Sequence, residues 1–426
     1  MLAYAYVVMS TAFATDLEDY ERRRLAERVA TQVDSVRRRG DAALGGAASG
    51  ADPVALTQEE INDCIRSLSP DVLEDLRAMQ GRQRRLARAQ RAALVDFETG
   101  WTGDSRFGVR HVPLRSVGLC VPEGGGASTD PCAIQAAAIA ARVAGVERVV
   151  ACVGSGSPLL VAALTLAGAD EFYRVSGPLG LAALTIGTES IPRVDLPLAL
   201  GDDALAAAQA QLCATGRDGV AGLLVIADES ADAELVTADL IAAVEASPTA
   251  RAVLITTSPA LAATVATVAD RQLRSFPDAS LARRAWRRAQ ALHVVDDLRD
   301  ACSLANRYSL ARIEVLTAEP RRLLPRLTRC NELYLGAHAA APLTGGPLRL
   351  GALPGTGGCH PLSPGRFLRT ITYQEARPSA GGYRSGALAR HWRAAGLEAR
   401  ARACELRAAR RVAEGDRTRD TALPLV

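Results

Sequence analysis

Residues 115–154 read RSVGLCVPEGGGASTDPCAIQAAAIAARVAGVERVVACVG. Apolar residues from Val117 to Val121 predict a strand, and small residues from Pro131 to Ala144 predict a helix after a Gly-rich turn. The β-branched run from Val146 to Val153 predicts a second strand. Together these elements form one β-α-β crossover, which is the repeating unit of a parallel α/β sheet.

The glycines of the turn, Gly124 to Gly126, allow two interpretations. Glycine lets the backbone come close to another group, and the N-terminus of the next helix offers unpaired N–H groups, so the turn is a candidate cradle for an anion or a nucleotide. The spacing is not that of G-x-G-x-x-G, and a Gly-rich turn of this kind is as often only a tight corner. Both interpretations stay open.

The 426 residues are enough for two main domains with appended segments. Helical spacing of apolar residues, a capping box at Thr57 and Glu60, and a Gly/Ala-rich linker predict a helical N-terminal region over residues 1–108. The first α/β domain is expected over residues 109–222 and the second over residues 223–341. A Gly/Pro-rich loop and a C-terminal helical segment for dimerisation complete the chain over residues 342–426.

The second domain repeats the alternation of strands and helices, so the predicted fold class is α/β with two Rossmann-like domains, a helical N-terminal region and a C-terminal helical segment. Any ligand is expected in a cleft between the domains. The predicted strands are Leu223 to Ala227, Ala252 to Thr256, Leu292 to Val295, Ile313 to Leu316 and the run ELYLG, and the predicted helices are Ala231 to Glu245, Pro259 to Phe276, Leu298 to Tyr308 and, at the C-terminus, Ala387 to Ala413.

Several motifs, in order along nearly the whole chain, carry a family resemblance. They are VRRRGDAAL (36–44), the crossover itself, LAALTIGTESIPRVD (181–195), LLVIADESA (223–231), ANRYSL (305–310), LYLG (333–336) and GLEA (396–399). With these motifs the chain resembles histidinol dehydrogenase. The resemblance implies two Rossmann-like domains, a Zn ion that holds the substrate, a Glu-His pair for acid/base catalysis, two NAD-dependent hydride transfers and an intertwined homodimer.

The positions that match the family's functional residues hold other side chains here. Four metal-ligand positions read Ala243, Ala246, the Thr344-Gly345-Gly346 loop and Arg400, and the catalytic pair reads Ala311-Arg312. The NAD contacts match Cys120, Leu179 and Ala199 to Asp202, and a substrate-binding serine matches Ala221. Alanine and glycine have no donor atom in the side chain, and arginine is permanently charged with no lone pair to offer. We therefore predict no metal and no cofactor.

Two arginines, Arg312 and Arg400, replace a base and a ligand, and they predict a fixed cationic site for a carboxylate, an enolate or another acidic oxygen. Glu245, between the two alanines, could act as a base if desolvated or, more commonly, neutralise an arginine. His360, in the Gly/Pro-rich loop, is a further candidate, although a lone loop histidine is more often a surface or hydrogen-bonding residue.

These residues predict a protein that keeps the fold and has lost the dehydrogenase reaction. The first hypothesis is a metal-independent and cofactor-independent enzyme of specialised metabolism, such as a cyclase or isomerase, acting on a larger apolar substrate whose acidic group the arginines hold. The alternatives are a non-catalytic binding or scaffold protein and an NAD-dependent alcohol dehydrogenase with a rearranged site.

Composition narrows the range of partners. Every basic residue other than the five histidines is arginine, which excludes lysine Schiff-base chemistry, and the net charge of +3 is too small to argue for nucleic-acid binding. No apolar run has the length of a membrane span, and the apolar residues 1–15 lack the basic start of a signal peptide, so a cytoplasmic protein is expected. The nine scattered cysteines predict core packing. The expected partners are a small-molecule substrate and a second copy of the chain.

Overall fold

The computed structural model describes residues 23–44, 55–100, 105–122, 131–154, 157–201, 203–214, 222–245, 250–276, 281–308, 310–340, 362–376 and 385–420. The chain forms two compact units. Unit 1 comprises residues 1–94, 113–216 and 359–368, and unit 2 comprises residues 95–112, 217–358 and 369–426. The units are therefore interleaved in the sequence, where four consecutive segments were expected.

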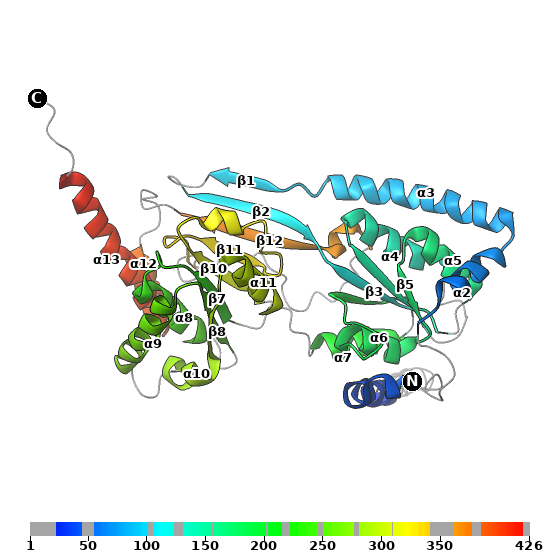
Figure 1. Cartoon of the computed structure of the whole chain (residues 1–426), viewed down its shortest axis with the longest axis horizontal. Coiled ribbons are helices and arrows are strands. Elements are labelled where there is room, and N and C mark those ends of the chain that lie inside the picture. The colour runs from blue at the N-terminus through cyan, green and yellow to red at the C-terminus, as the bar shows by residue number, and fades with distance from the viewer. Residues whose placement is uncertain are drawn as a thin grey trace, which may run out of the picture. The chain divides into compact units, whose positions relative to one another are not determined.

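Unit 1 is built on a parallel four-stranded sheet with the order β5-β4-β3-β6. The helices α4 and α5 lie on one face of this sheet, and α6 and α7 lie on the other (Figure 1). The elements are β3 (Ser116–Cys120), α4 (Pro131–Ala144), β4 (Arg148–Cys152), α5 (Pro158–Ala167), β5 (Glu171–Tyr173), α6 (Gly177–Ile186), β6 (Leu196–Ala199) and α7 (Asp203–Ala214). Both strands and the helix of the predicted crossover are present, and α4 has the predicted bounds.

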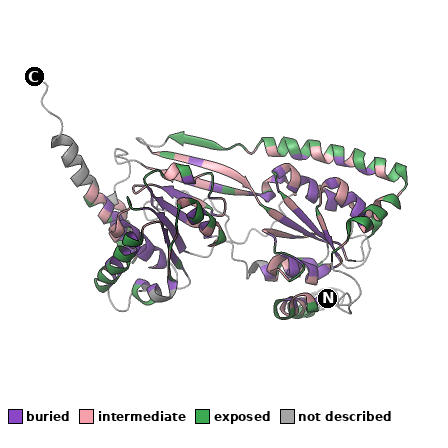
Figure 2. Cartoon of the chain, viewed as in Figure 1, coloured by how far each residue is buried: buried purple, intermediate pink, exposed green. Residues whose placement is uncertain are grey.

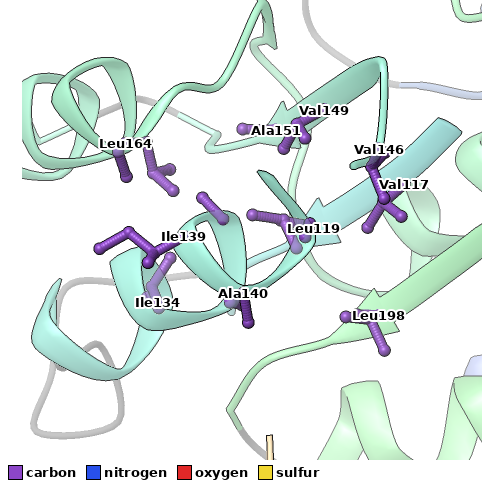
Figure 3. Packing of buried hydrophobic residues seen from close by; sticks show 14 of the residues in the cluster. Val117, Leu119, Ile134, Ile139, Ala140, Val146, Val149, Ala151, Leu164 and Leu198 are labelled. Carbon is purple, nitrogen blue, oxygen red and sulfur yellow. The ribbon is translucent and has the colours of Figure 1, made fainter. Parts of the chain in front are cut away.

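Small side chains allow the helices of unit 1 to lie close to the sheet. In Figure 3, Val117 and Leu119 of β3, Ile139 and Ala140 of α4 and Leu164 of α5 belong to one cluster of buried apolar side chains. All of these side chains are apolar and buried. The contact between the helices and the sheet, called the apolar seam below, is therefore made by apolar side chains.

Helices cover unit 1 further. They are residues 23–39, η1 (Gly40–Ala43), α2 (Gln58–Arg66), α3 (Pro70–Ala92) and η5 (Pro364–Phe367). The predicted capping box is present, because Thr57 accepts from the Glu60 N–H while the Glu60 carboxylate accepts from the Thr57 N–H. Figure 2 shows α3 mostly exposed, and its buried Gln80 donates to Gln135 and to the Ala163 carbonyl.

Unit 2 contains an eight-stranded sheet with the order β1-β2-β12-β11-β10-β7-β8-β9. The run from β12 to β9 is parallel, and β1 pairs with β2 in antiparallel fashion. The strands are β1 (Phe97–Gly100), β2 (Arg106–Pro113), β7 (Gly222–Ala227), β8 (Arg251–Thr256), β9 (Gln290–Val294), β10 (Arg312–Leu316), β11 (Glu332–Leu335) and β12 (Leu368–Glu375).

The helices of unit 2 divide between the two faces of this sheet. On one face α8 (Ala233–Glu245), α9 (Pro259–Arg274), α10 (Leu281–Ala289) and α13 (Glu398–Asp420) share one buried cluster. On the other face α11 (Leu298–Tyr308) packs against β7, β8, β10 and β11, beside η3 (Pro320–Leu323). The helix α12 (Ser385–Ala394) packs on α13. None of the described helices is long and apolar enough to cross a membrane.

Two expectations need correction. Residues 97–100 and 106–113 are strands, although residues 1–108 were expected to be helical. The single C-terminal helix expected from Ala387 to Ala413 is two helices, because Gly396 adopts a φ of 76° that ends the first one. The helix α10 and the strand β12 had no sequence prediction. The α/β fold class with two sheet domains and helical segments is confirmed.

Candidate functional site

Three of the predicted site residues lie at one edge of the sheet of unit 2. The parallel strands β7 and β10 are neighbours, so Arg312 begins β10 beside Gly222, which begins β7. The helix α8 connects β7 to the parallel strand β8 and must run back across the sheet. Its last residue, Glu245, therefore returns to this same amino-terminal edge.

A backbone contact fixes Arg312 at this edge. Its Nε donates to the Gly222 carbonyl at 3.1 Å, and the side chain is half-buried. Gly222 has a φ of 153°, and a Cβ there would collide with the backbone of Arg251 at the start of β8. Within the described ranges, no carboxylate forms an ion pair with Arg312. The Nη atoms of its guanidinium can therefore fork onto an external oxyanion.

The Glu245 carboxylate caps a helix that lies 154 residues away in the sequence. Its two oxygens accept from the N–H groups of Ala399 and Arg400, at 3.0 and 3.2 Å, in the first turn of α13. Burial raises the pKa of Glu245, while these two hydrogen bonds and the nearby Arg400 act in the opposite direction. Both oxygens of the Glu245 carboxylate are thus used to cap the N-terminus of α13.

Arg400 lies directly beside Glu245. Its guanidinium carbon is 5.0 Å from the ring centroid of Trp392 in α12, which is a cation–π geometry. The structure thus brings Glu245 and Arg400 into contact and places Arg312 at the same sheet edge, bonded to Gly222. His360 lies outside the described residues.

A second region matches the expected nucleotide positions, at the carboxyl edge of the sheet in unit 1. Cys120, the last residue of β3, is the register partner of Ala199, the last residue of β6. The connections after β3 and β6 go to opposite faces, so a topological switch point lies here. Leu179 packs in the same buried cluster as Cys120. The Cys120 thiol is buried and donates to the Gly177 carbonyl, so at this position it offers no polar group to a nucleotide.

The family model for histidinol dehydrogenase matches residues 16–408. The chain belongs to the histidinol dehydrogenase family. It is 34% identical over 342 residues to a histidinol dehydrogenase homolog of Shouchella clausii, covering 76% of this chain and 79% of that protein.

Two further matches come from other organisms. The chain is 35% identical over 323 residues to a histidinol dehydrogenase of Rhizobium meliloti, covering 72% and 73% of the two chains. A crystal structure of histidinol dehydrogenase from Elizabethkingia anophelis is similar at a TM-score of 0.49 and 19% identity, over 90% of this chain and 92% of that one.

The residues of this family member do not fit the zinc ion that the resemblance implies. Ala243 is a buried methyl group in the core between α8 and the sheet. Arg400 offers only donors, and its backbone N–H is bound by Glu245. Ala246 and residues 344–346 lie outside the described residues, but alanine, threonine and glycine are poor or impossible zinc ligands. Among the described residues, no group of three His, Cys, Asp or Glu side chains could hold a metal ion.

One buried ion pair near the site was missed on the sequence. Arg407 of α13 is 2% exposed, and its Nη1 donates to Asp239 of α8 at 2.7 Å while its Nε donates to the Ala337 carbonyl at 2.7 Å. The signal was available: Asp239 is the only charged residue in the interior of the apolar helix LVTADLIAAV (235–244). A buried carboxylate needs a partner, so a buried cation was to be expected near it.

Proposed function

We propose that this member of the histidinol dehydrogenase family does not carry out the zinc-dependent and NAD-dependent oxidation. It acts as a metal-independent and cofactor-independent enzyme of specialised metabolism. The reaction class is a cyclisation or isomerisation of a larger apolar substrate that carries an acidic group, because neither reaction needs an oxidant or a reductant. The arginines at the amino-terminal edge of unit 2 hold the acidic group.

The observation that carries this proposal is the position of Arg312. It occupies a catalytic position of the family, a backbone carbonyl holds one nitrogen, and no carboxylate of the described residues neutralises it. A guanidinium held in this way is preorganised, so it can stabilise negative charge that develops on an enolate or carboxylate oxygen without a reorganisation cost.

The neighbourhood of Arg312 also favours a second candidate function. Glu245, the acidic residue that was a candidate base, is bound by two backbone N–H groups of α13. With Arg312 held in place and the Glu245 carboxylate already hydrogen-bonded, the site can bind an acidic ligand but has, among the described residues, no free base to catalyse a reaction of it. A non-catalytic binding protein is therefore the second candidate, and it is distinguished from the first by the absence of turnover of a bound ligand.

The loss of the dehydrogenase reaction is tested on the purified chain. Elemental analysis after dialysis against excess zinc, together with a calorimetric titration with NAD, should give no stoichiometric zinc and no saturable nucleotide binding. Stoichiometric zinc, or reduction of NAD in the presence of histidinol, would contradict the proposal and would favour a dehydrogenase with a rearranged site.

The role of Arg312 is tested by substitution. Thermal stabilisation by decanoate, an apolar carboxylate, is measured for the wild type, Arg312→Ala, Arg312→Lys and the control Arg299→Ala, which removes an exposed arginine of α11. We expect Arg312→Ala to lose about tenfold in affinity or more, Arg312→Lys to keep part of it, and the control to match the wild type. Equal affinity in all four proteins would contradict the role of Arg312.

We also propose that the chain forms a homodimer with exchange of its C-terminal segment. In the structure α13 packs on α8 of its own chain through a shared apolar cluster and an ion pair between Arg410 and Asp232. The same contacts can be made by the C-terminal segment of a second copy. Light scattering after size-exclusion chromatography would give the mass, and a mixture of two tagged forms would show whether the segments exchange.

A further inference from the structure

Charged contacts, rather than large interlocking side chains, position α13 on α8. At one end Glu245 accepts from the backbone of Ala399 and Arg400, and at the other end Arg410 pairs with Asp232. Between them lies the buried pair of Arg407 and Asp239. These three contacts show that the two helices run antiparallel, and they fix the distance between them.

A groove follows from this arrangement. Small residues face each other between the three contacts, and they leave a space of about 350 Å³ bounded by α8, α9 and α13. Because the charged contacts hold the helices in place, the space cannot close by moving α13 inward. The groove has apolar walls formed by Ala238, Ile241, Phe276, Ala399, Leu406 and Ala409.

Four polar side chains also line the groove, and each has a partner within the chain: Glu234, Gln272, Arg402 and Glu405. Arg402 stacks on Phe276 with its guanidinium carbon 4.2 Å from the ring centroid, and it donates to Glu398 at 3.0 Å. Glu405 accepts from Arg393 at 2.8 Å, and Glu234 accepts from Gln272 at 2.8 Å. The groove therefore offers little to a peptide backbone, which would need unsatisfied donors and acceptors along its length.

We infer that this groove is a binding site for a neutral apolar small molecule of the size of one or two rings. Ligand pockets range from about 300 to 1,000 Å³, so the volume suits a small ligand and not a helix of a partner protein. Apolar cavities lined by alkyl and aromatic side chains exclude water and take up apolar molecules. The site uses neither Arg312 nor Arg400, so it stands independently of the proposed reaction.

The test uses the full chain and the neutral fluorophore N-phenyl-1-naphthylamine, whose emission rises in an apolar environment. We expect saturable binding of one probe per chain. Ala409→Leu on the exposed side of α13 and Ala238→Leu on α8 narrow the groove, and each should weaken binding about tenfold or more. Ala266→Leu adds the same atoms at an exposed position of α9 outside the groove and serves as the matched control.

The two groove variants and the control give different results only if the groove binds the probe. Because Ala238 is buried, its variant can be lost to misfolding, and the exposed Ala409 then carries the test alone. Unchanged binding in Ala409→Leu, or an equal loss in Ala266→Leu, would overturn the proposal. A loss of dimer mass in Ala409→Leu, with probe binding that depends on protein concentration, would assign the groove to a second copy instead and would also overturn it. Failure of the Arg312 experiment affects none of these results.

Discussion

In unit 1, α4 meets its sheet through apolar side chains, whereas in unit 2, α13 meets α8 through small apolar residues and, in addition, through a buried arginine and aspartate. The first seam is close-packed, with alanines of α4 against Val117 and Leu119. The second seam has a groove beside it, and its position is set by Arg407 and Asp239. Apolar packing fills the space between two elements, while charged contacts fix a distance and leave the intervening space to a ligand.

The largest loss of stability is expected from a substitution of Arg407. Arg407→Met leaves the Asp239 carboxylate buried without its cation, so the free energy of unfolding should fall by about 4 kcal/mol. Urea unfolding followed by circular dichroism measures the loss. The control is the ion pair between exposed Arg271 and half-buried Glu234, where Arg271→Met should cost less than about 1 kcal/mol. Adding Asp239→Leu to Arg407→Met should recover most of the loss, and equal losses in the two single variants would refute a dominant role for the buried pair.

The apolar seam is tested at Leu164, which packs in the core of unit 1 shown in Figure 3. Leu164→Ala removes buried methyl groups from a well-packed site, and it should lower the free energy of unfolding by about 3 kcal/mol. Leu86→Ala makes the same chemical change at a position of α3 that is 63% exposed, and it should cost less than about 0.5 kcal/mol. A small loss at Leu164 would show that the seam can collapse around the cavity.

The smallest change in stability is expected from the ionisation of Glu245. Burial raises its pKa above 4.5, so the folded protein holds the proton more tightly than the unfolded chain does. The stability from this proton is fully present below the unfolded pKa and is lost as pH rises through the folded pKa. Glu245→Gln, which cannot ionise, should match the wild type in acid and equal or exceed its stability at neutral pH.

The control for Glu245 is complete removal of the cap. Glu245→Ala should cost about 1 kcal/mol across the pH range, because the N–H groups of Ala399 and Arg400 lose their acceptor. Urea unfolding at a series of pH values separates the two variants. A Glu245→Gln variant whose deficit grows with pH would show that the ionised carboxylate is favoured in the folded state.

Local patterns were enough for the elements whose neighbours are close in sequence. The strand β3 and the helix α4 follow from β-branched and small residues, and the capping box at Thr57 follows from a spacing of three. The strand β12 was not found, because it is defined by its pairing with β11 across a long intervening segment. The strand β1 was not found although its partner β2 comes next in the chain, because its four residues FETG are all exposed and show no apolar alternation. The family membership, read from motifs distributed along the chain, is confirmed by the comparisons.

For the candidate site, too, residue identities could be predicted from the sequence but long-range contacts could not. The identities of Arg312, Arg400 and Glu245 were available from the sequence, but the contact that commits Glu245 to α13 joins residues 154 positions apart. Arg407 lies in a helix rich in arginine, where a solvated side chain is the usual expectation. Its burial depends on Asp239, which is 168 positions away, and no local pattern encodes such a partner.

The interleaving of the two units constrains how the chain matures. Residues 95–112 belong to the unit that is completed only by residues 369–426, so β2 leaves the ribosome long before the strands and helices that complete its unit exist. Pairings between segments so distant in sequence form slowly, since the intervening chain must first be brought together. A nascent chain stopped before β12 would leave β2 and β11 without the strand that lies between them, and an open sheet edge of this kind is prone to pair with other chains.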